Sequence, residues 1–99
     1  MTTAHSIADE RRAHPRHRVF KRVKAVFNAN NSIIDCTMRD LSLGGARLSC
    51  AQAVLLPETF VLVFMAEREM RDVRVAWRKF NEVGVQFMSP PRNALRLLI

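Results

Sequence analysis

Six short apolar runs, most of them alternating with polar residues, constrain the fold of this chain more than any other feature. In the run over 46–50, for example, Ala46, Leu48 and Cys50 alternate with two polar residues. A period of two is typical of a β-strand that buries one face. Turn residues separate successive runs, and the runs cover residues 19–27, 33–39, 46–50, 59–66, 70–79 and 83–88.

The number and spacing of these runs predict an all-β fold, a six-stranded antiparallel β-barrel. Strands at intervals of roughly 8–12 residues are typical of sandwiches and barrels, and a closed barrel leaves no exposed strand edge. The run over 59–66 is almost wholly apolar, so we expect cover on both of its faces. After Pro90 and Pro91, Leu95 and Leu98 fall at helical spacing and predict a short C-terminal helix. The expected division is a flexible tail over residues 1–9, a barrel domain with a flexible N-terminal arm over 10–90, and the helix over 91–99.

The composition limits the chain to one domain with a modest core and an excess of positive charge. Of its 99 residues, 48% are hydrophobic, and the formal net charge is +7 with a pI near 11.0. A basic protein attracts anions, so the partners that fit this charge are a nucleotide, a nucleic acid or an acidic membrane surface. No apolar run is long enough to span a bilayer, and the first residues lack the features of a secretory signal. We therefore expect a cytoplasmic protein that does not insert into a membrane.

The two cysteines, Cys36 and Cys50, both fall within predicted strands. Their spacing allows a disulfide. In a cytoplasmic chain, however, thiols are usually kept reduced, and unpaired cysteine is among the most buried residue types. We therefore expect two buried free thiols.

A basic segment precedes the first predicted strand and contains Arg11, Arg12 and Arg16. Pro15 disfavours helix at the residue before it, so we expect a bent or extended arm. Arginine can bind two phosphate oxygens at once and can stack its planar group on a base. Taken alone, however, the segment favours an ordinary solvated basic N-terminus.

A second polar segment joins two predicted strands at residues 40–45. Asp40 and Ser42 are separated by one residue, so in an extended segment their side chains leave on the same side. A carboxylate accepts hydrogen bonds from groups such as the N–H groups of a purine, and a hydroxyl can donate or accept. Gly44 and Gly45 allow positive φ and a close approach of the backbone to a ligand. Taken alone, the segment favours a turn in which Asp40 and Ser42 cap their own backbone.

Together, the two segments resemble the PilZ domain, a bacterial receptor module for cyclic di-GMP. That family has an R-x-x-x-R motif followed by a D/N-x-S-x-x-G motif, which correspond here to residues 12–16 and 40–45. Residues 75–78 and 83–87 also resemble the closing strands of the family, and the resemblance extends over residues 10–88. It implies a six-stranded β-barrel with a C-terminal helix.

The resemblance also implies a ligand, cyclic di-GMP, and a set of binding residues. The arginines would hold the phosphates and stack on guanine, with Arg11 assisting the other two. The aspartate and serine would hydrogen-bond a guanine edge, and the glycine would let the loop pass close to the ligand. Binding would order the N-terminal arm and change the surface offered to a downstream protein partner. The implied binding residues are Arg11, Arg12, Arg16, Asp40, Ser42 and Gly45.

Two other functions are consistent with the sequence. A basic barrel that binds nucleic acid fits the charge of +7, although the arm lacks the aromatic residues of a single-strand binding platform. The second alternative is a PilZ-like module that binds only proteins. Neither the number of nucleotides bound nor the identity of a protein partner follows from the sequence.

We expect neither catalysis nor a cofactor, because no nucleophile–base pair, carboxylate dyad or P-loop is visible. A metal site is not expected either. His14 and His17 lie close in sequence, but no cysteine or carboxylate completes a ligand set with them. Trp77 shares the strand parity of Val73 and Val75, so we expect it to belong to the core.

Overall fold

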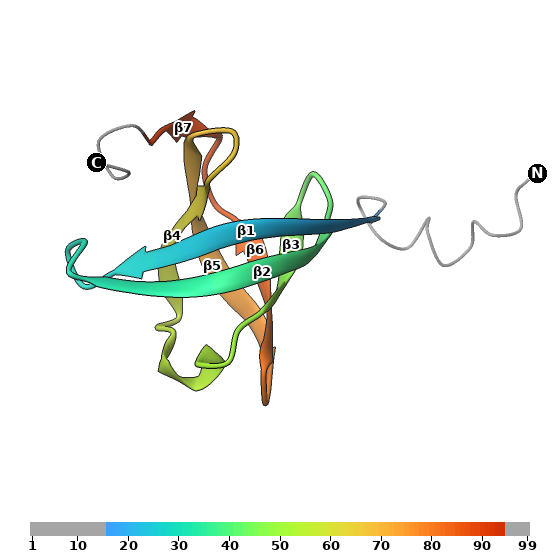
Figure 1. The fold of residues 1–99 in the computed structure, drawn as a ribbon, viewed down its shortest axis with the longest axis vertical. Helices are drawn as coiled ribbons and strands as arrows, with labels where there is room; N and C mark the ends of the chain where they lie inside the picture. The colour runs from blue at the N-terminus through green and yellow to red at the C-terminus, as the bar shows by residue number, and fades with distance from the viewer. Residues whose placement is uncertain (1–15, 95–99) are drawn as a thin grey trace, which may run out of the picture.

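The computed structural model describes residues 16–94, which form an antiparallel β-barrel with one added strand (Figure 1). The order in the sheet is β4-β1-β2-β3-β6-β5-β7, and an additional pairing of β4 with β5 closes the first six strands into a barrel. The predicted six-stranded antiparallel barrel is therefore confirmed. Its elements are β1 (His17–Phe27), β2 (Ser32–Leu41), β3 (Gly45–Ser49), the 3-10 helix η1 (Ala53–Leu55), β4 (Thr59–Phe64), β5 (Glu69–Lys79), β6 (Glu82–Phe87) and β7 (Arg92–Asn93).

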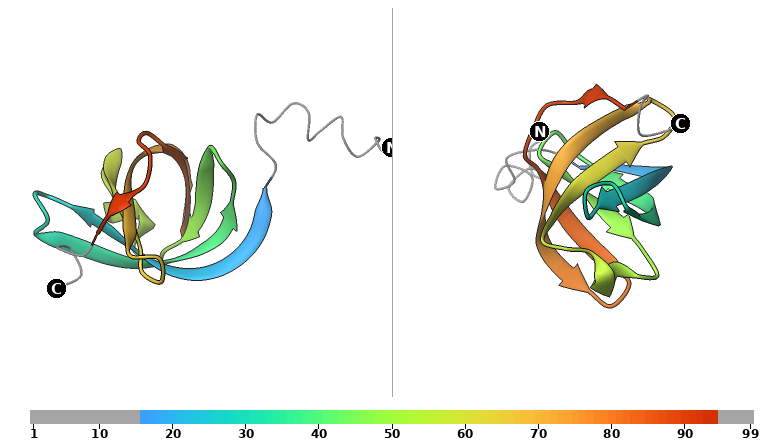
Figure 2. Two further views of the ribbon diagram at one scale, coloured as in Figure 1. Left: turned by 90° about the horizontal axis from the view of Figure 1, so that it is seen from above. Right: turned by 90° about the vertical axis from the view of Figure 1, so that its left-hand side faces the viewer.

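The strands β1 and β2 form a long hairpin that crosses one side of the barrel and projects beyond it at the β1–β2 turn (Figure 2). The turn has positive φ at three successive residues, Asn28, Ala29 and Asn30. Asparagine adopts this left-handed region more readily than most residues do, which explains the asparagine-rich sequence of the turn. At the other end of the hairpin, β1 begins beside the last residue of β2, because His17 is paired with Leu41.

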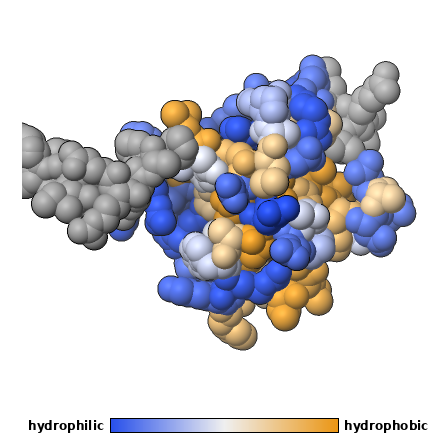
Figure 3. Space-filling model, turned by 180° about the vertical axis from the view of Figure 1, so that it is seen from behind, coloured by the Kyte–Doolittle hydropathy of each residue, from blue (hydrophilic) through white to orange (hydrophobic). Residues whose placement is uncertain are grey.

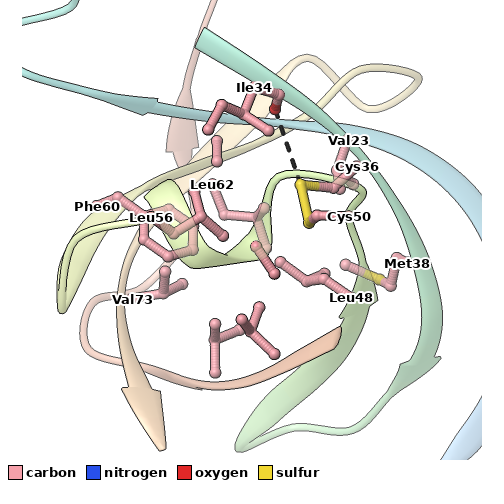
Figure 4. Close-up of a cluster of buried hydrophobic side chains, with 14 of the residues drawn as sticks. Val23, Ile34, Cys36, Met38, Leu48, Cys50, Leu56, Phe60, Leu62 and Val73 are labelled. Carbon is pink, nitrogen blue, oxygen red and sulfur yellow. Dashed lines mark hydrogen bonds between the residues drawn. A yellow bond between two sulfur atoms is a disulfide. The ribbon is translucent and has the colours of Figure 1, made fainter. Parts of the chain in front are cut away.

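The core fills the interior of the barrel with the inward-facing apolar residues of all six strands (Figure 4). Met38, Leu48, Leu62 and Val83 are fully buried. Burying a large apolar side chain contributes about 1.5–3 kcal/mol, so this set supplies most of the driving force for closing the barrel.

A second, smaller cluster lies on the outer face of β1 and β4, where Val26 and Val63 are buried together with Ala94. In β4, Phe60, Leu62 and Phe64 belong to the barrel core, whereas Val63 belongs to this outer cluster. The expectation that the apolar run over 59–66 is covered on both faces is confirmed for β4.

The predicted C-terminal helix is wrong for the residues that the structure describes. Arg92 and Asn93 form β7, which pairs with Met70 and Glu69 at the start of β5. The pairing of β6 with β5 begins only at Val73, so the start of β5 has a free edge on that side. The chain that follows the two prolines pairs with the backbone groups of this edge. Residues 95–99, the tail expected over residues 1–9 and the part of the expected arm that precedes Arg16 lie outside the described residues.

The expectation of two free thiols is also wrong, because Cys36 and Cys50 form a disulfide with a Cα–Cα distance of 4.7 Å. The register of β2 and β3 pairs Thr37 with Ser49, so the two cysteines lie opposite each other just beyond that pair. Their predicted burial is confirmed, with 5% and 2% of each residue exposed. The spacing of the two cysteines in the sequence allows a disulfide but does not show that the register of β2 and β3 places their sulfur atoms side by side in the core.

Reducing this disulfide is expected to lower the free energy of unfolding by about 3 kcal/mol. The bond closes a loop with a sequence separation of 14, and a loop of this length restricts the unfolded chain by about that amount. Urea denaturation with and without a phosphine reductant measures the difference. The variant Cys36→Ser/Cys50→Ser is the control and should not respond to reductant. Two titratable thiols in the denatured, unreduced protein would contradict the disulfide.

Candidate functional site

The candidate site begins with four residues that lie opposite one another on adjacent strands. Trp77 of β5 is paired with Gly84 of β6, Gly84 with Arg47 of β3, and Arg47 with Asp40 of β2. The neighbours of Gly84 in β6, Val83 and Val85, point into the core, so this row lies on the outer face of the barrel.

The pairing of β1 with β2 brings Arg16 to the same place. His17 is paired with Leu41, so Arg16, the residue before β1, lies beside Ser42, the residue after β2. Arg16 is exposed, and Asp40 and Ser42 are partly buried. The two sequence segments therefore meet because their strands are antiparallel neighbours.

These residues surround a cleft of about 190 Å³. Four of the six predicted ligand-binding residues line this cleft, and the other two, Arg11 and Arg12, lie outside the described residues. The roles of all six residues in binding a ligand stay predictions. The lining residues that matter for the argument are Arg16, Asp40, Ser42, Gly45, Arg47 and Trp77. Seen from behind, the outer surface of the barrel carries hydrophilic side chains with apolar patches between them (Figure 3).

Asp40 is held by Arg47, which the sequence did not indicate. The Nε of Arg47 donates to Oδ2 of Asp40 at 2.5 Å, and its Nη1 donates to Oε2 of Glu82 at 2.7 Å. The hydrogen bond to Asp40 is the main cause that raises the pKa of the Arg47 guanidinium above its ordinary value, with attraction to both carboxylates adding to it. Within residues 16–94, the second carboxylate oxygen of Asp40, Oδ1, has no hydrogen-bond partner, and the Asp40 side chain is 13% exposed.

Ser42 stabilises the turn between β2 and β3. Its Oγ accepts hydrogen bonds from the backbone N–H groups of Gly44 and Gly45, both at 3.2 Å, and donates to the carbonyl oxygen of Gly45 at 3.3 Å. The structure thus shows backbone capping for Ser42, whereas Asp40 binds a side chain instead. Ser42 lines the cleft, but its hydroxyl already donates one hydrogen bond and accepts two, which is its full capacity. A contact with a ligand would have to replace one of these bonds, and the role of Ser42 in binding stays a prediction.

Gly45 of this turn acts through close packing and not through positive φ, which none of the glycines adopts. A Cβ built on Gly45 would lie 2.1 Å from the carbonyl oxygen of Val85. Gly45 therefore lets β3 approach the backbone of β6. Neither Gly44 nor Gly45 uses the positive φ that glycine allows, and the expected close approach of this loop to a ligand stays a prediction.

Trp77 is not part of the core, contrary to the prediction from its parity with Val73 and Val75. The pairing of β5 with β6 shifts between Val75 and Trp77, so Ala76 is an extra residue of the kind found in a β-bulge. The shift moves Trp77 to the outer face. A Cβ on Gly84 would lie 2.1 Å from the indole Nε1, so the indole covers Gly84 and forms one wall of the cleft.

The same shift turns the next residue, Arg78, towards the end of the barrel. Its Nη1 donates to the carbonyl oxygens of Ala53 and Leu56 at 2.7 and 2.9 Å. These bonds fix η1 against the end of β5. The strand pattern alone predicts neither position, because a bulge becomes visible only when the partner strand is known.

The PilZ domain family model matches residues 10–99 of this chain. The chain belongs to the PilZ family. PilZ domains are binding and adaptor modules, and the absence of enzymatic activity in this one stays a prediction. No match to a curated protein was found.

Two further observations concern the described part of the PilZ domain only. Residues 16–94 contain no group of three or more His, Cys, Asp or Glu side chains arranged to hold a metal ion. They also contain no helix with the length and apolar character needed to cross a membrane. His14 lies outside the described residues, and the expectation of no metal stays a prediction.

Replacing Gly45 by alanine is expected to lower the free energy of unfolding by about 1–3 kcal/mol, because the obstacle is backbone and β3 must separate from β6. Urea denaturation measures the loss. Gly84→Ala is the matched comparison, since there the added methyl meets the Trp77 side chain. We expect that variant to shift the fluorescence of Trp77, the only tryptophan of the chain, with a smaller loss of stability. A Gly45→Ala variant as stable as wild type would contradict the close approach.

Proposed function

We propose that this PilZ domain is a receptor for cyclic di-GMP and that the cleft on its outer face binds part of the nucleotide. The observation that best supports this function is the gathering of Arg16, Asp40, Ser42 and Trp77 around one cleft. They offer a cation, an anion, a hydroxyl and a flat aromatic surface. This combination suits a ligand that carries both phosphates and guanine bases.

Each side chain has a role that follows from its chemistry. The exposed guanidinium of Arg16 would bind phosphate oxygens. The indole of Trp77 would stack on a base, which is worth about 1–3 kcal/mol in other proteins. Oδ1 of Asp40 would accept a hydrogen bond from an N–H group of guanine. Guanine has more N–H donors than adenine on its base-pairing edge, so this contact would favour guanine.

The size of the cleft indicates that it holds only part of the ligand. Its 190 Å³ is smaller than the about 300–1,000 Å³ typical of ligand pockets. The rest of the nucleotide would be held by the arm, which supplies Arg11 and Arg12. Arg12 lies four residues before Arg16, so the two Cα atoms are within about 14 Å of each other even in an extended chain.

Binding would fix the arm on the barrel and so change the surface seen by a downstream protein. Fixing each backbone residue costs about 1–2 kcal/mol of conformational entropy, and the charge-assisted contacts of the arginines would have to exceed that cost. The output of the domain would then be a change of surface, with cyclic di-GMP as the signal.

We expect Arg16→Ala to weaken cyclic di-GMP binding by about 10- to 100-fold, the loss typical of a hydrogen bond to a charged group. Isothermal titration calorimetry measures the affinity. Arg22→Ala is the matched control, because Arg22 is an exposed arginine of β1 that does not line the cleft. Equal affinities for Arg16→Ala and wild type would contradict the assigned role. Salt-sensitive binding of arbitrary oligonucleotides, with no binding of cyclic di-GMP, would instead favour a nucleic-acid binder.

Cyclic di-GMP is expected to quench the fluorescence of Trp77, and Trp77→Ala should bind about 5- to 100-fold more weakly because a stacking surface is lost. A fluorescence titration of wild type and calorimetry of the variant test this. Phe80→Ala is the control, since Phe80 is an aromatic residue three positions later that is 88% exposed and does not line the cleft. Binding with no change in Trp77 fluorescence would argue against stacking.

A further inference from the structure

The outer face of the β1–β2 hairpin carries three arginines that no acid neutralises. Val19 and Val23 pack with the barrel core, so Arg18 and Arg22, which have the opposite parity in β1, point outward. Arg39 of β2 lies on the same outer face, against the side chain of a β1 residue between these two arginines. All three arginines are exposed, and within residues 16–94 none of them has a hydrogen-bond or ion-pair partner.

The acids of the hairpin do not offset this charge. The strand β1 contains no acid, and the two acids of β2, Asp35 and Asp40, are each paired with another cation. Nζ of Lys24 donates to Oδ1 of Asp35 at 2.5 Å, and Nε of Arg47 donates to Oδ2 of Asp40 at 2.5 Å. The outer face of the hairpin therefore attracts anions.

An aromatic ring stands among these arginines. Phe20 lies between Arg18 and Arg22 in β1 and is 77% exposed. The guanidinium carbon of Arg39 lies 5.7 Å from the centroid of the Phe20 ring, so a planar cation is placed over an aromatic surface. We refer to Arg18, Phe20, Arg22 and Arg39 as the basic face. An exposed aromatic ring beside arginines is the arrangement on which unpaired bases stack.

The basic face is longer than a single phosphate group. Arg18 and Arg22 are four residues apart, which is about 13 Å along a strand. Beyond Arg22 lies a second cleft of about 650 Å³, which is also lined by Thr37 and Ser49. These two residues are paired in the register of β2 and β3, and their hydroxyls can donate to phosphate oxygens. The face therefore fits a chain that carries several phosphates.

We propose that the basic face binds single-stranded nucleic acid, with its arginines on the phosphates and the ring of Phe20 against a base. A duplex keeps its bases stacked on one another, so it would leave the ring without a partner. The barrel thus supplies the aromatic residue that the N-terminal arm lacks. This activity is additional to the proposed binding of cyclic di-GMP and does not depend on it, because no residue of the basic face lines the nucleotide cleft.

The ring of Phe20 is tested by fluorescence anisotropy of a labelled deoxythymidine oligonucleotide of about 12 nucleotides, a length that one small barrel domain can bind. Phe20→Leu keeps an apolar side chain and removes the ring, so its affinity is expected to fall about 5- to 100-fold. Phe80→Leu is the matched control, because Phe80 is 88% exposed and lies in the turn between β5 and β6. It should bind as wild type does. Equal affinities for Phe20→Leu and wild type would overturn the proposal.

The arginines are tested by the salt dependence of the same binding. Arg22→Gln should make the plot of log affinity against log salt concentration shallower by about 0.7, the change for one phosphate contact on a single strand. Arg74→Gln is the matched control, because Arg74 is an exposed arginine of β5, which pairs with neither β1 nor β2. Its slope should equal that of wild type. The same change of slope in both variants would mean that net charge alone is measured, which would also overturn the proposal.

Calorimetry with cyclic di-GMP separates this inference from the proposed function. Phe20→Leu and Arg22→Gln should bind cyclic di-GMP as wild type does, because neither residue lines the nucleotide cleft. A protein that binds the oligonucleotide through Phe20 and does not bind cyclic di-GMP would contradict the proposed function alone. A protein that binds no oligonucleotide at low salt, or that binds only vesicles of anionic phospholipid, would overturn the inference alone.

Discussion

The antiparallel pairing of β1 with β2 is the constraint on which the candidate site depends. The pair His17–Leu41 places the residue before β1 beside the residue after β2. Segments that are more than twenty residues apart in sequence thus converge without a long loop. A slip of one residue in this pairing would turn the inward set of β1, which includes Val23 and Ala25, out of the core. The energy of core burial therefore also fixes the geometry of the cleft.

Two small residues and one irregularity complete that geometry. Gly45 lets β3 approach β6, and Gly84 leaves room on the outer face that the indole of Trp77 covers. The shift in pairing after Val75 turns Trp77 outward. The strands that stabilise the barrel thus also give the cleft its shape. Arg47 holds Asp40, and the turn backbone holds Ser42. Such preorganisation lowers the entropy cost of binding.

The sequence predicted the parts of this structure that depend on local pattern. Alternation identified the strands, and the polar segments at 12–16 and 40–45 identified four residues that line one cleft. It failed where the partner strand decides the outcome. The disulfide of Cys36 with Cys50, the outward position of Trp77 and the bridging of Asp40 to Glu82 by Arg47 all follow from the register. The helix expected after Pro91 was wrong at Arg92 and Asn93, because a free strand edge outweighed local helical spacing.

A titration of isotope-labelled protein with cyclic di-GMP, followed by nuclear magnetic resonance, tests the account most directly. We expect the backbone signals of Arg16, of residues 40–47 and of Gly84 to shift together with the single indole N–H signal of Trp77. Signals of η1, at Ala53–Leu55, should stay in place. Shifts confined to η1 or to the β1–β2 turn, or no shift at all, would contradict the assignment of this cleft as the nucleotide site.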